Sequence, residues 1–330
     1  MAADALSDLL KTVRLTGAAF FDVAASEPWV AESPPRDMIL PKILPGADHL
    51  IAYHVVTMGR CFASMPGSEP ITVEAGEVVV FANGDPHVMS SSPGMRADPI
   101  AAEALDAATA GRLPFVMNYG GDGPVAARLV CGFLACDARP FNPLLENLPP
   151  VIKAGGQKDD DGGRLGQFIR VAVMESASKR AGGESVLAKL SELMFIEVVR
   201  RYVEALPPQQ AGWLAGLRDP FVGKALSLLR GRPAHGWTIE QLAKEVGLSR
   251  SVLAERFADL LGIPPMHYLA RWRIQIAAQL LSGGNVNIAT IAARTGYESE
   301  AAFSRAFKKL MGVPPAAWRR QRTAASKMIQ

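Results

Sequence analysis

The sequence predicts a multidomain α+β protein, with strands in its N-terminal half and only helices in its C-terminal third. Short apolar runs broken by Gly, Pro and Asn-Gly, such as residues 71–91, are typical of strands. Residues 238–262 and 287–312 share a second pattern, in which a short and a longer helical segment flank a glycine. With 330 residues, of which 49% are hydrophobic, the chain can bury more than one core.

The composition predicts a cytoplasmic protein without a membrane span or a structural disulfide. No run of 18 apolar residues occurs, so we expect no membrane span. The segment MAADALSDLLKTVRL carries two Asp before its first Lys and lacks the layout of a signal peptide. The 3 cysteines are few and odd in number, which predicts a reducing cytoplasm and no structural disulfide.

Residues 76–91, GEVVVFANGDPHVMSS, resemble the second half of a cupin signature. Gly76, Gly84 and His87 stand at the expected spacing, although Ala82 replaces the usual proline. The resemblance implies a small cupin-like β-barrel, with residues 1–153 as an effector-binding domain.

Cupin enzymes hold their metal with two His and a Glu from the first strand pair, together with the His that matches His87. Gly59 is in place here, but the His-x-His and the Glu are missing, and His49 and His54 have the wrong spacing. We therefore expect no cofactor and no enzymatic activity. Two interpretations of His87 stay open: a histidine bonded to the backbone at the barrel mouth, or a zinc site with His54 and a cysteine.

The effector or redox candidates are His54, Cys61, His87, Cys131 and Cys136. Cys131 and Cys136 lie five positions apart in one predicted strand, so their side chains face opposite sides and do not easily form a disulfide. Cys61 belongs to another strand. Buried inert thiols and a thiol redox switch are both consistent with this pattern.

A helical connector is expected after the barrel. Residues 154–163, AGGQKDDDGG, contain no core-forming residue and predict a flexible joint. Residues 164–210 then form helices, the second of which carries one apolar stripe: Leu187, Leu190, Met194, Val198 and Tyr202. The stripe is consistent with docking on the barrel, with a dimer interface, or with both.

The second copy of the repeat predicts two capped helices. Asn287 and Ser299 are suited to cap them, and Gly296 lies in the turn between them. The longer helix should turn one apolar face inward: Ala302, Phe303, Ala306, Phe307 and Leu310.

The first copy follows the same pattern. Thr238 and Gln241 match a capping box, Gly247 makes the turn, and Ser249 caps the second helix. The inward residues of this helix are Leu253, Phe257 and Leu260. A short helix, a glycine turn and a longer helix make a helix-turn-helix, whose second helix can enter the major groove of DNA.

A straight helix is expected between the copies, from Pro264 to the stop at Gly283 and Gly284. Its apolar stripe consists of Leu269, Trp272, Ile276 and Leu280. Eighteen helical residues span roughly 27 Å, which suits two recognition helices held about one DNA turn, roughly 34 Å, apart. Residues 219–330 contain 16 Lys and Arg against 7 Asp and Glu, which also favours a polyanion as partner.

Residues 219–322 resemble the DNA-binding domain of the AraC/XylS family of transcription regulators. The resemblance rests on WTIEQLAKEVGLSRSVLAERFADLLGIPPMHYLARWR and IATIAARTGYESEAAFSRAFKKLMGVPPAAWRR. It implies base contacts from the outward residues of both second helices: Arg250, Ser251, Ala254, Glu255, Glu300, Ala301, Ser304 and Arg305. The candidates for phosphate contacts are Lys308, Lys309, Arg319 and Arg320.

The N-terminal half also resembles the cupin-type members of this family, so the resemblance covers most of the chain. It implies a cytoplasmic, sequence-specific regulator that binds double-stranded promoter DNA. The barrel would respond to a small molecule or a redox signal, the chain would act as a homodimer, and RNA polymerase would be a further partner. The competing hypothesis is a metal-dependent cupin enzyme with an attached DNA-binding domain.

Overall fold

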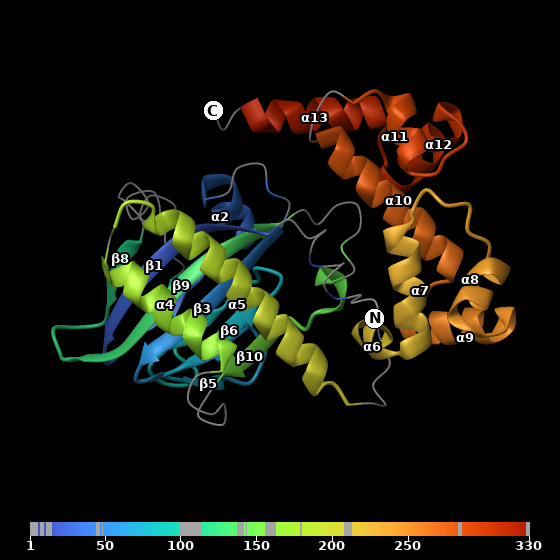
Figure 1. Ribbon diagram of the computed structural model, residues 1–330. Helices are drawn as coiled ribbons and strands as arrows, with labels where there is room; N and C mark the ends of the chain where they lie inside the picture. Colours follow the sequence, from blue (N-terminus) through green and yellow to red (C-terminus); the bar gives the residue numbers. More distant parts are fainter. Residues whose placement is uncertain are drawn as a thin grey trace. The chain divides into compact units, whose positions relative to one another are not determined.

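The computed structural model describes the residues 15–43, 49–98, 114–136, 144–155, 163–178, 180–207, 213–282 and 286–327, together with 6, 10, 47 and 142. Figure 1 shows their elements. The chain divides into two compact units. We call residues 14–137 and 148–205 the barrel unit, and residues 206–330 with the short segment 138–147 the helical unit.

Two β-sheets form the barrel unit. The larger has the strand order β10-β6-β3-β9-β1-β8, with β1 (Thr16–Ser26), β3 (His49–Met58), β6 (Glu77–Phe81), β8 (Phe115–Tyr119), β9 (Val125–Cys136) and β10 (Val151–Gly155). The smaller has the order β2-β7-β4-β5, with β2 (Val30–Glu32), β4 (Arg60–Ser64), β5 (Ile71–Glu74) and β7 (Val88–Ser90). The α+β class with a strand-rich N-terminal part is confirmed.

Apolar residues from both sheets meet in one core between them. Its fully buried members include Val56, Cys61, Val73, Phe81 and Leu129. All five residues of β6 are buried, which explains why residues 78–81 are a continuous apolar run rather than an alternating one.

Two glycines of the barrel unit are required by close backbone approach. A Cβ at Gly59 would lie 2.1 Å from the carbonyl oxygen of Ala126, and one at Gly84 would lie 2.8 Å from that of Leu50. Both residues have positive φ, 72° and 62°, so no other residue type fits these positions without strain.

Helices α4 (Arg164–Ser178) and α5 (Gly183–Ala205) lie across one face of the six-stranded sheet (Figure 1). Most of the predicted apolar stripe of α5 is buried, including Leu187, Met194 and Val198. The hydroxyls of Tyr53 on β3 and Ser191 on α5 are 2.6 Å apart in this buried interface. The stripe therefore docks on the sheet. The flexible joint expected at 154–163 lies mostly outside the described residues.

The remaining helices of the structure, apart from α2 (Arg36–Ile43) in the barrel unit, belong to the helical unit. They are α6 (Trp213–Arg218), α7 (Pro220–Gly231), α8 (Ile239–Val246), α9 (Arg250–Leu261), α10 (Pro265–Ser282), α11 (Ile288–Arg294), α12 (Glu300–Met311) and α13 (Pro315–Lys327). The short 3₁₀ helix Leu145–Asn147 also lies in this unit.

The predicted caps of both repeats are confirmed. Thr238 and Gln241 form the capping box of α8, and Ser249 accepts a hydrogen bond from the Val252 amide at the start of α9. In the second copy, Asn287 and Ser299 cap α11 and α12. The turn glycines of the two motifs, Gly247 and Gly296, have φ values of 86° and 79°.

The prediction that Leu310 faces inward is wrong. This side chain is 38% exposed, whereas Phe303 and Phe307 on the same helix are completely buried. Leu310 lies in the last turn of α12, two residues before the cap Gly312, and the neighbouring Met311 packs against the core instead.

Helix α10 joins two separate cores. Its first half contributes Tyr268, Leu269 and Trp272 to the core of α7, α8 and α9. Its second half contributes Ile274, Ala277, Ala278 and Leu281 to the core of α11, α12 and α13. The expected straight spacer is therefore also a shared structural element of both helix-turn-helix motifs.

Within the described residues, no helix is both long and apolar enough to cross a membrane.

Two apolar residues of α12 differ in burial, so their replacement should cost different amounts of stability. Phe307→Ala should destabilise the second helix-turn-helix by about 3–5 kcal/mol, because it removes a completely buried ring. Leu310→Ala, a change in an exposed side chain of the same helix, should cost less than about 1 kcal/mol. Hydrogen exchange of the α11 and α12 amides measures both. Equal losses of protection in the two variants would contradict this division.

Candidate functional sites

Helix α9 presents its expected contact residues at the surface, but its charges are partly engaged. Arg250, Ser251 and Glu255 are exposed, and Ala254 is half-buried. The guanidinium of Arg250 lies 3.0 Å from the carboxylate of Glu240 on α8.

A second arginine of α9 also has a partner. The Nε of Arg256 donates to the carboxylate of Asp219 over 2.8 Å, and the same carboxylate accepts hydrogen bonds from the first amides of α7. This pair bridges 37 positions of the chain, and no local pattern predicts it.

Helix α12 carries free positive charge on its outward side. Glu300, Ala301 and Arg305 are exposed, Ser304 is half-buried, and Lys308 and Lys309 are exposed. The described residues provide no ion-pair partner for Arg305, Lys308 or Lys309. Compared with α9, this helix offers more uncompensated charge to a polyanion.

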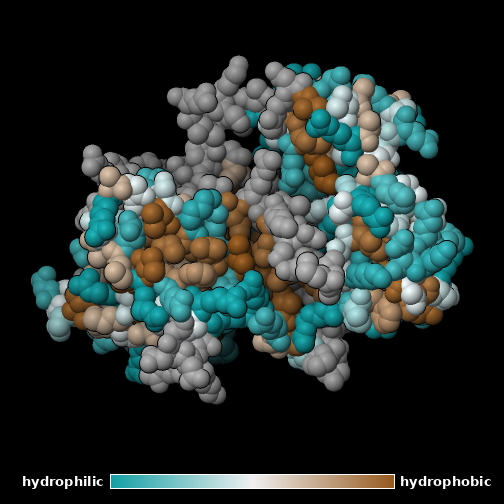
Figure 2. All heavy atoms as spheres, in the orientation of Figure 1, coloured by the Kyte–Doolittle hydropathy of each residue, from teal (hydrophilic) through white to brown (hydrophobic). Residues whose placement is uncertain are grey.

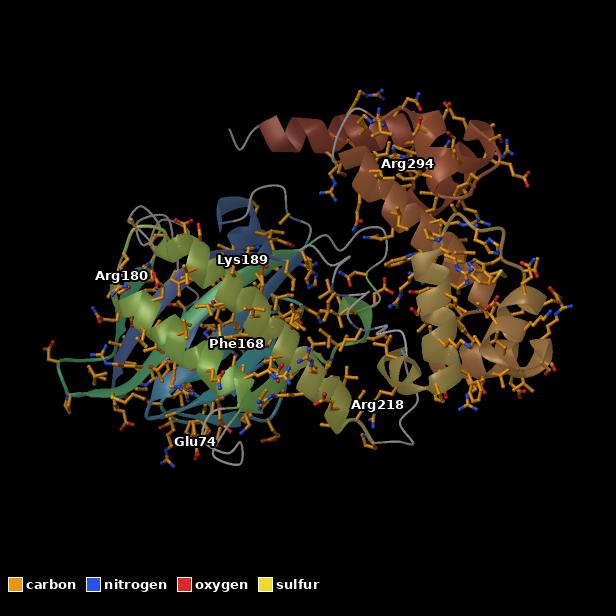
Figure 3. The ribbon with its side chains drawn as sticks, viewed as in Figure 1. Glu74, Phe168, Arg180, Lys189, Arg218 and Arg294 are labelled. Atoms are coloured by element: carbon orange, nitrogen blue, oxygen red, sulfur yellow. The ribbon has the colours of Figure 1, made fainter. Side chains whose placement is uncertain are left out.

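The last predicted cations lie on α13. Arg320 is exposed. Arg319 is half-buried and donates to the carbonyl oxygen of Val286, just before α11, so it also stabilises the second motif. Arg294 at the end of α11 (Figure 3) is exposed as well. Arg294 was not among the residues predicted from the sequence, although it ends the first helix of the motif.

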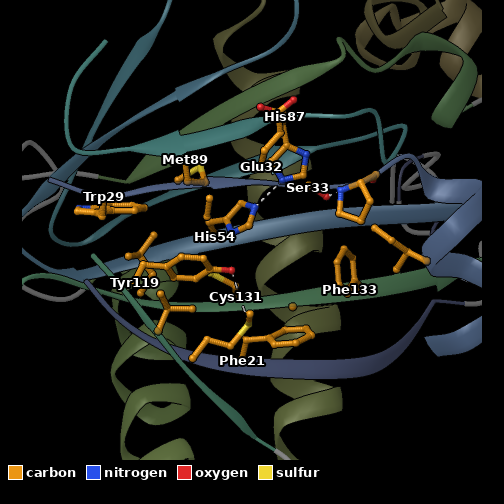
Figure 4. A pocket seen from close by; sticks show the side chains of 17 residues that line it. Phe21, Trp29, Glu32, Ser33, His54, His87, Met89, Tyr119, Cys131 and Phe133 are labelled. Atoms are coloured by element: carbon orange, nitrogen blue, oxygen red, sulfur yellow. Dashed lines mark hydrogen bonds between the residues drawn. The ribbon is translucent and has the colours of Figure 1, made fainter. Parts of the chain in front are cut away.

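The barrel unit contains a cavity of about 90 Å³ between its two sheets (Figure 4). Aromatic and aliphatic side chains form most of its wall, including Phe21, Trp29, Met89, Tyr119, Leu129 and Phe133. Three of the predicted effector or redox candidates, His54, His87 and Cys131, also line this cavity. Cys61 belongs to the surrounding core.

His54 and His87 form a direct hydrogen bond. Their Nε2 atoms are 2.7 Å apart, and His87 Nδ1 lies 2.8 Å from the backbone carbonyl oxygen of Asp85. The interpretation of His87 as a backbone-bonded histidine is therefore confirmed. The ring of His87 also stacks on Phe81, with 3.8 Å between ring centroids.

Both imidazoles are neutral at pH 7. Burial lowers the pKa of His87 from 6.5 to about 4. Burial, with a contribution from the neighbouring His87, lowers the pKa of His54 well below its ordinary value. Within the barrel, a charged imidazolium would lose its hydration, and for His87 the nearby Asp85 offsets only part of this loss.

The structure offers no third ligand to this histidine pair. Within the described parts of the chain, His, Cys, Asp and Glu side chains nowhere gather in threes in a way that suits a metal ion. The two Nε2 atoms that would bind zinc are hydrogen-bonded to each other instead. The zinc hypothesis with His54, His87 and a cysteine therefore has no cluster to support it among these residues.

The three cysteines form no disulfide, and all three are buried. Burial raises the pKa of Cys61 to about 12 and that of Cys131 well above its ordinary value, so both are thiols rather than reactive thiolates at neutral pH. The register of β3 and β9 runs without a bulge from His54↔Cys131 to His49↔Cys136. Cys131 and Cys136 therefore face opposite sides of the sheet, as predicted.

An ion pair at the cavity was not predicted. Glu32 lines the cavity, and its carboxylate accepts a hydrogen bond of 2.9 Å from Nε of Arg96. This interaction holds the pKa of Glu32 below its usual value. The partners are 64 positions apart, which leaves no local signal in the sequence.

Comparisons with known proteins show which families the two parts of the chain match. Residues 4–204 match a family model described as Cupin, and residues 242–321 match one described as Helix-turn-helix domain. A protein of Streptomyces lividans named as an AraC-like transcription regulator is 33% identical over 279 residues, which cover 84% of this chain and 89% of that protein. AlkR, an HTH-type transcriptional regulator of Acinetobacter baylyi, is 26% identical over 322 residues, which cover 96% and 99%.

One solved structure is similar to part of the chain. It is the crystal structure of a transcriptional regulator from Chromobacterium violaceum, described as one of the proteins that contain an AraC-type DNA-binding domain. The similarity covers 32% of this chain and 94% of that chain, with 28% identity and a TM-score of 0.31.

The histidine pair predicts an acid-sensitive barrel. The unfolded chain binds a proton at the ordinary histidine pKa of 6.5, whereas folded His87 does so only near 4. Stability should therefore fall as the pH drops through this window, by about 2 kcal/mol between pH 6.5 and 5 for His87 alone. Urea unfolding of the barrel unit at several pH values measures the effect.

Two variants test the assignment of this pH dependence. His87→Gln should make it less steep, because one of the two buried imidazoles with a lowered pKa is removed. His267→Gln, a change in an exposed histidine of the helical unit, should leave it unchanged. A steep acid loss that persists in His87→Gln would assign the effect to other groups.

Proposed function

The chain belongs to the AraC-like transcription regulators, and from this premise we propose how its parts divide the work. Residues 1–153 bind an effector in the barrel cavity, residues 164–210 connect and dimerise, and residues 219–322 bind promoter DNA. The observation that carries the proposal is the pair of capped helices, α9 and α12. Helix α9 buries Leu253 and Phe257 in one core, and α12 buries Phe303 and Phe307 in the other. Both leave their expected contact residues at or near the surface.

Base recognition is assigned to the outward residues of these two helices. Arg305 is suited to donate two parallel hydrogen bonds to the major-groove edge of guanine, and Glu300 is suited to accept one from cytosine. The side chains of Ser251, Ala254 and Ala301 are short, so each helix can lie deep in the groove and contact thymine methyl groups. Arg250, Glu255 and Ser304 complete the proposed contact set.

Helix α12 contributes more affinity than α9 in this proposal. Lys308 and Lys309 lie along it without ion-pair partners in the described structure, and their contacts to phosphates release counterions. Arg250 of α9 must first give up its 3.0 Å contact with Glu240. Arg320, with Arg319 beside it, extends the phosphate-binding surface onto α13.

Dimerisation is assigned to the outer face of α4 and α5. Four large apolar side chains are exposed there, namely Val171 (46%), Met174 (71%), Val186 (41%) and Leu193 (42%). Figure 2 shows hydrophobic atoms gathered over this part of the barrel unit, and Phe168, labelled in Figure 3, lies on α4 within it. Apolar surface of this kind is typical of protein interfaces.

The effector acts by stabilising one of two arrangements of the dimer, because a ligand shifts an equilibrium only through its different affinities for the two states. We place the protein in the cytoplasm, where promoter DNA and RNA polymerase are available as partners. The barrel serves sensing rather than catalysis. This choice over the enzyme hypothesis is supported by relatives that are named as transcription regulators.

Selection of fragmented genomic DNA on the purified protein at physiological salt tests the DNA-binding proposal. The expected result is enrichment of a few promoters, with two contact blocks one helical turn apart. Arg305→Ala with Glu300→Ala should lose this enrichment, since each lost base contact costs about 1–3 kcal/mol.

The control for this selection is Arg180→Ala, which removes an exposed arginine from the barrel unit (Figure 3). It should enrich the same promoters as the unchanged protein. Diffuse enrichment that neither change affects would mean that the repeat binds DNA without sequence preference.

Phosphate contacts predict a separate signature. Lys308→Ala should weaken binding to all sequences alike and reduce the slope of log affinity against log salt by about 1. Lys189→Ala, which removes a lysine that pairs with Glu192 in the barrel unit, should leave the slope unchanged. Titrations at four salt concentrations measure both slopes. An unchanged slope in Lys308→Ala would remove this residue from the phosphate-contact set.

The dimer proposal predicts that Met174→Lys shifts the protein to monomers, because it places a charge in an apolar interface. Met38→Lys is the matched control, since Met38 on α2 is also exposed, at 43%. Sedimentation equilibrium measures both variants. Dimers of equal strength in the two variants would move the interface away from α4 and α5.

A further inference from the structure

Arg273 lies on α10 at the boundary between the two cores of the helical unit. The residue before it, Trp272, belongs to the first core, that of α7, α8 and α9, and the residue after it, Ile274, belongs to the second core, that of α11, α12 and α13. Among the principal contacts between the described helices, none joins a helix of the first core directly to a helix of the second. Because long helices bend, a further contact at this boundary is needed to hold the two helix-turn-helix motifs in one relative orientation.

The guanidinium of Arg273 binds the loop between α7 and α8. Its Nε donates to the carbonyl oxygen of Pro233 over 2.7 Å, and its Nη2 donates to that of His235 over 2.8 Å. Trp237 fixes this loop, because its ring belongs to the first core and its amide donates to the same His235 carbonyl over 2.8 Å. Two hydrogen bonds therefore tie Arg273 to a loop that the first core holds in place.

The turn of the second motif also lies against this guanidinium. A Cβ at Gly296 would lie 2.8 Å from Nη2 of Arg273 and 2.8 Å from the Cα of Ala234, which belongs to the α7–α8 loop. The approach to the backbone of Ala234 leaves no room for a side chain. Gly296 is therefore required by its contact with this loop as well as by its φ of 79°.

Tyr297 fixes the same turn to the second core. Its ring packs against that core and meets the ring of Phe303 edge-on, with 5.5 Å between centroids. The Cζ of Arg273 lies 5.9 Å from the centroid of the Tyr297 ring, a distance at which a cation is attracted to an aromatic face. One guanidinium thus contacts a loop held by the first core and a turn held by the second.

The chemistry of arginine suits this position. Its guanidinium is planar and presents its N–H donors in a fixed fork, so it can bind two carbonyl oxygens and lie against a ring at the same time. Hydrogen bonds from a charged donor are stronger than neutral ones, and Arg273 is half-buried, which limits competition from water. Rotation of one motif relative to the other would break these contacts.

We infer that Arg273 is a positioning residue that holds the two helix-turn-helix motifs in one relative orientation and so sets the arrangement of DNA half-sites that the protein accepts. The inference rests on the proposed DNA contacts of α9 and α12. In this role Arg273 binds the protein backbone rather than DNA, so its effect on DNA affinity is indirect.

A distance measurement between the two motifs tests this orientation without DNA. Nitroxide labels on Glu245→Cys in α8 and Ala293→Cys in α11 occupy exposed positions outside the proposed contact set, and the three native cysteines are buried. Electron–electron double resonance on the full chain, diluted with unlabelled chain, should give one narrow distance distribution. Arg273→Met should broaden or shift it, because the neutral side chain loses both hydrogen bonds. An unchanged distribution in this variant would overturn the inference.

Arg271→Met is the matched control. Arg271 is also a half-buried arginine of α10, but it pairs with Glu146, 3.4 Å away, and its loss should leave the narrow distribution unchanged. If Arg273→Met does not fold, Arg273→Lys provides the same test, because a single ammonium does not reproduce the planar fork, and the distribution should again broaden. Equal changes in the Arg271 and Arg273 variants would reject the assignment to Arg273.

DNA affinity provides the functional readout. The probe is a promoter fragment enriched in the genomic selection, compared with the same fragment after one of its two contact blocks has been scrambled. The factor by which the second block improves affinity should fall about tenfold in Arg273→Met, since only a fraction of the loosened orientations fits both blocks. Arg271→Met should keep this factor. A variant that is only less stable would lose affinity for both fragments alike, because the folded fraction cancels in the ratio.

The positioning role and the proposed DNA contacts fail in different ways. If two contact blocks are enriched but the second block improves affinity equally in Arg273→Met and in the unchanged protein, the regulator function is retained and the positioning role is rejected. If no fragment with two blocks is enriched, the proposed DNA contacts are rejected, and the nitroxide distances alone decide whether Arg273 fixes the orientation.

Discussion

The alternation of side chains along β3 is the constraint on which the barrel unit depends. Tyr53 points out of the sheet and meets Ser191 of α5 in a buried hydrogen bond, while His54, the next residue, points in and meets His87. Since successive side chains of a strand face opposite sides, one short stretch of strand fixes both the helical cover and the cavity. A register shift of a single residue would exchange the two environments, and neither set of partners would remain.

In the helical unit, local sequence signals determine where each helix ends, and one long helix connects the two helix-turn-helix motifs. Ser, Thr and Asn caps and left-handed glycines define the two motifs. Helix α10 then gives its first half to one core and its second half to the other. Both motifs are therefore attached to a single rigid element.

The parts of the fold that the sequence predicts are those that local chemistry determines. The capping box at Thr238 and the turn at Gly296 each involve only residues within four positions along the chain, and both are confirmed. Contacts between distant residues were largely missed. The pair of Arg256 and Asp219, 37 positions apart, was not predicted. His54 and His87, 33 positions apart, were considered together only as zinc ligands, not as a hydrogen-bonded pair. Helical periodicity also misplaced Leu310, because the neighbouring Met311 packs against the core in its place.

Because α10 contributes to both cores, it also affects how the protein dissociates from DNA. In the proposed mode of DNA binding, when one recognition helix detaches, the other holds it close to its half-site, so rebinding occurs at a high effective concentration rather than from bulk solution. A stiff link provides this advantage only at the matching separation. Inserting one base pair between the half-sites would rotate them by about a tenth of a turn, and the avidity would be lost even with every base contact intact.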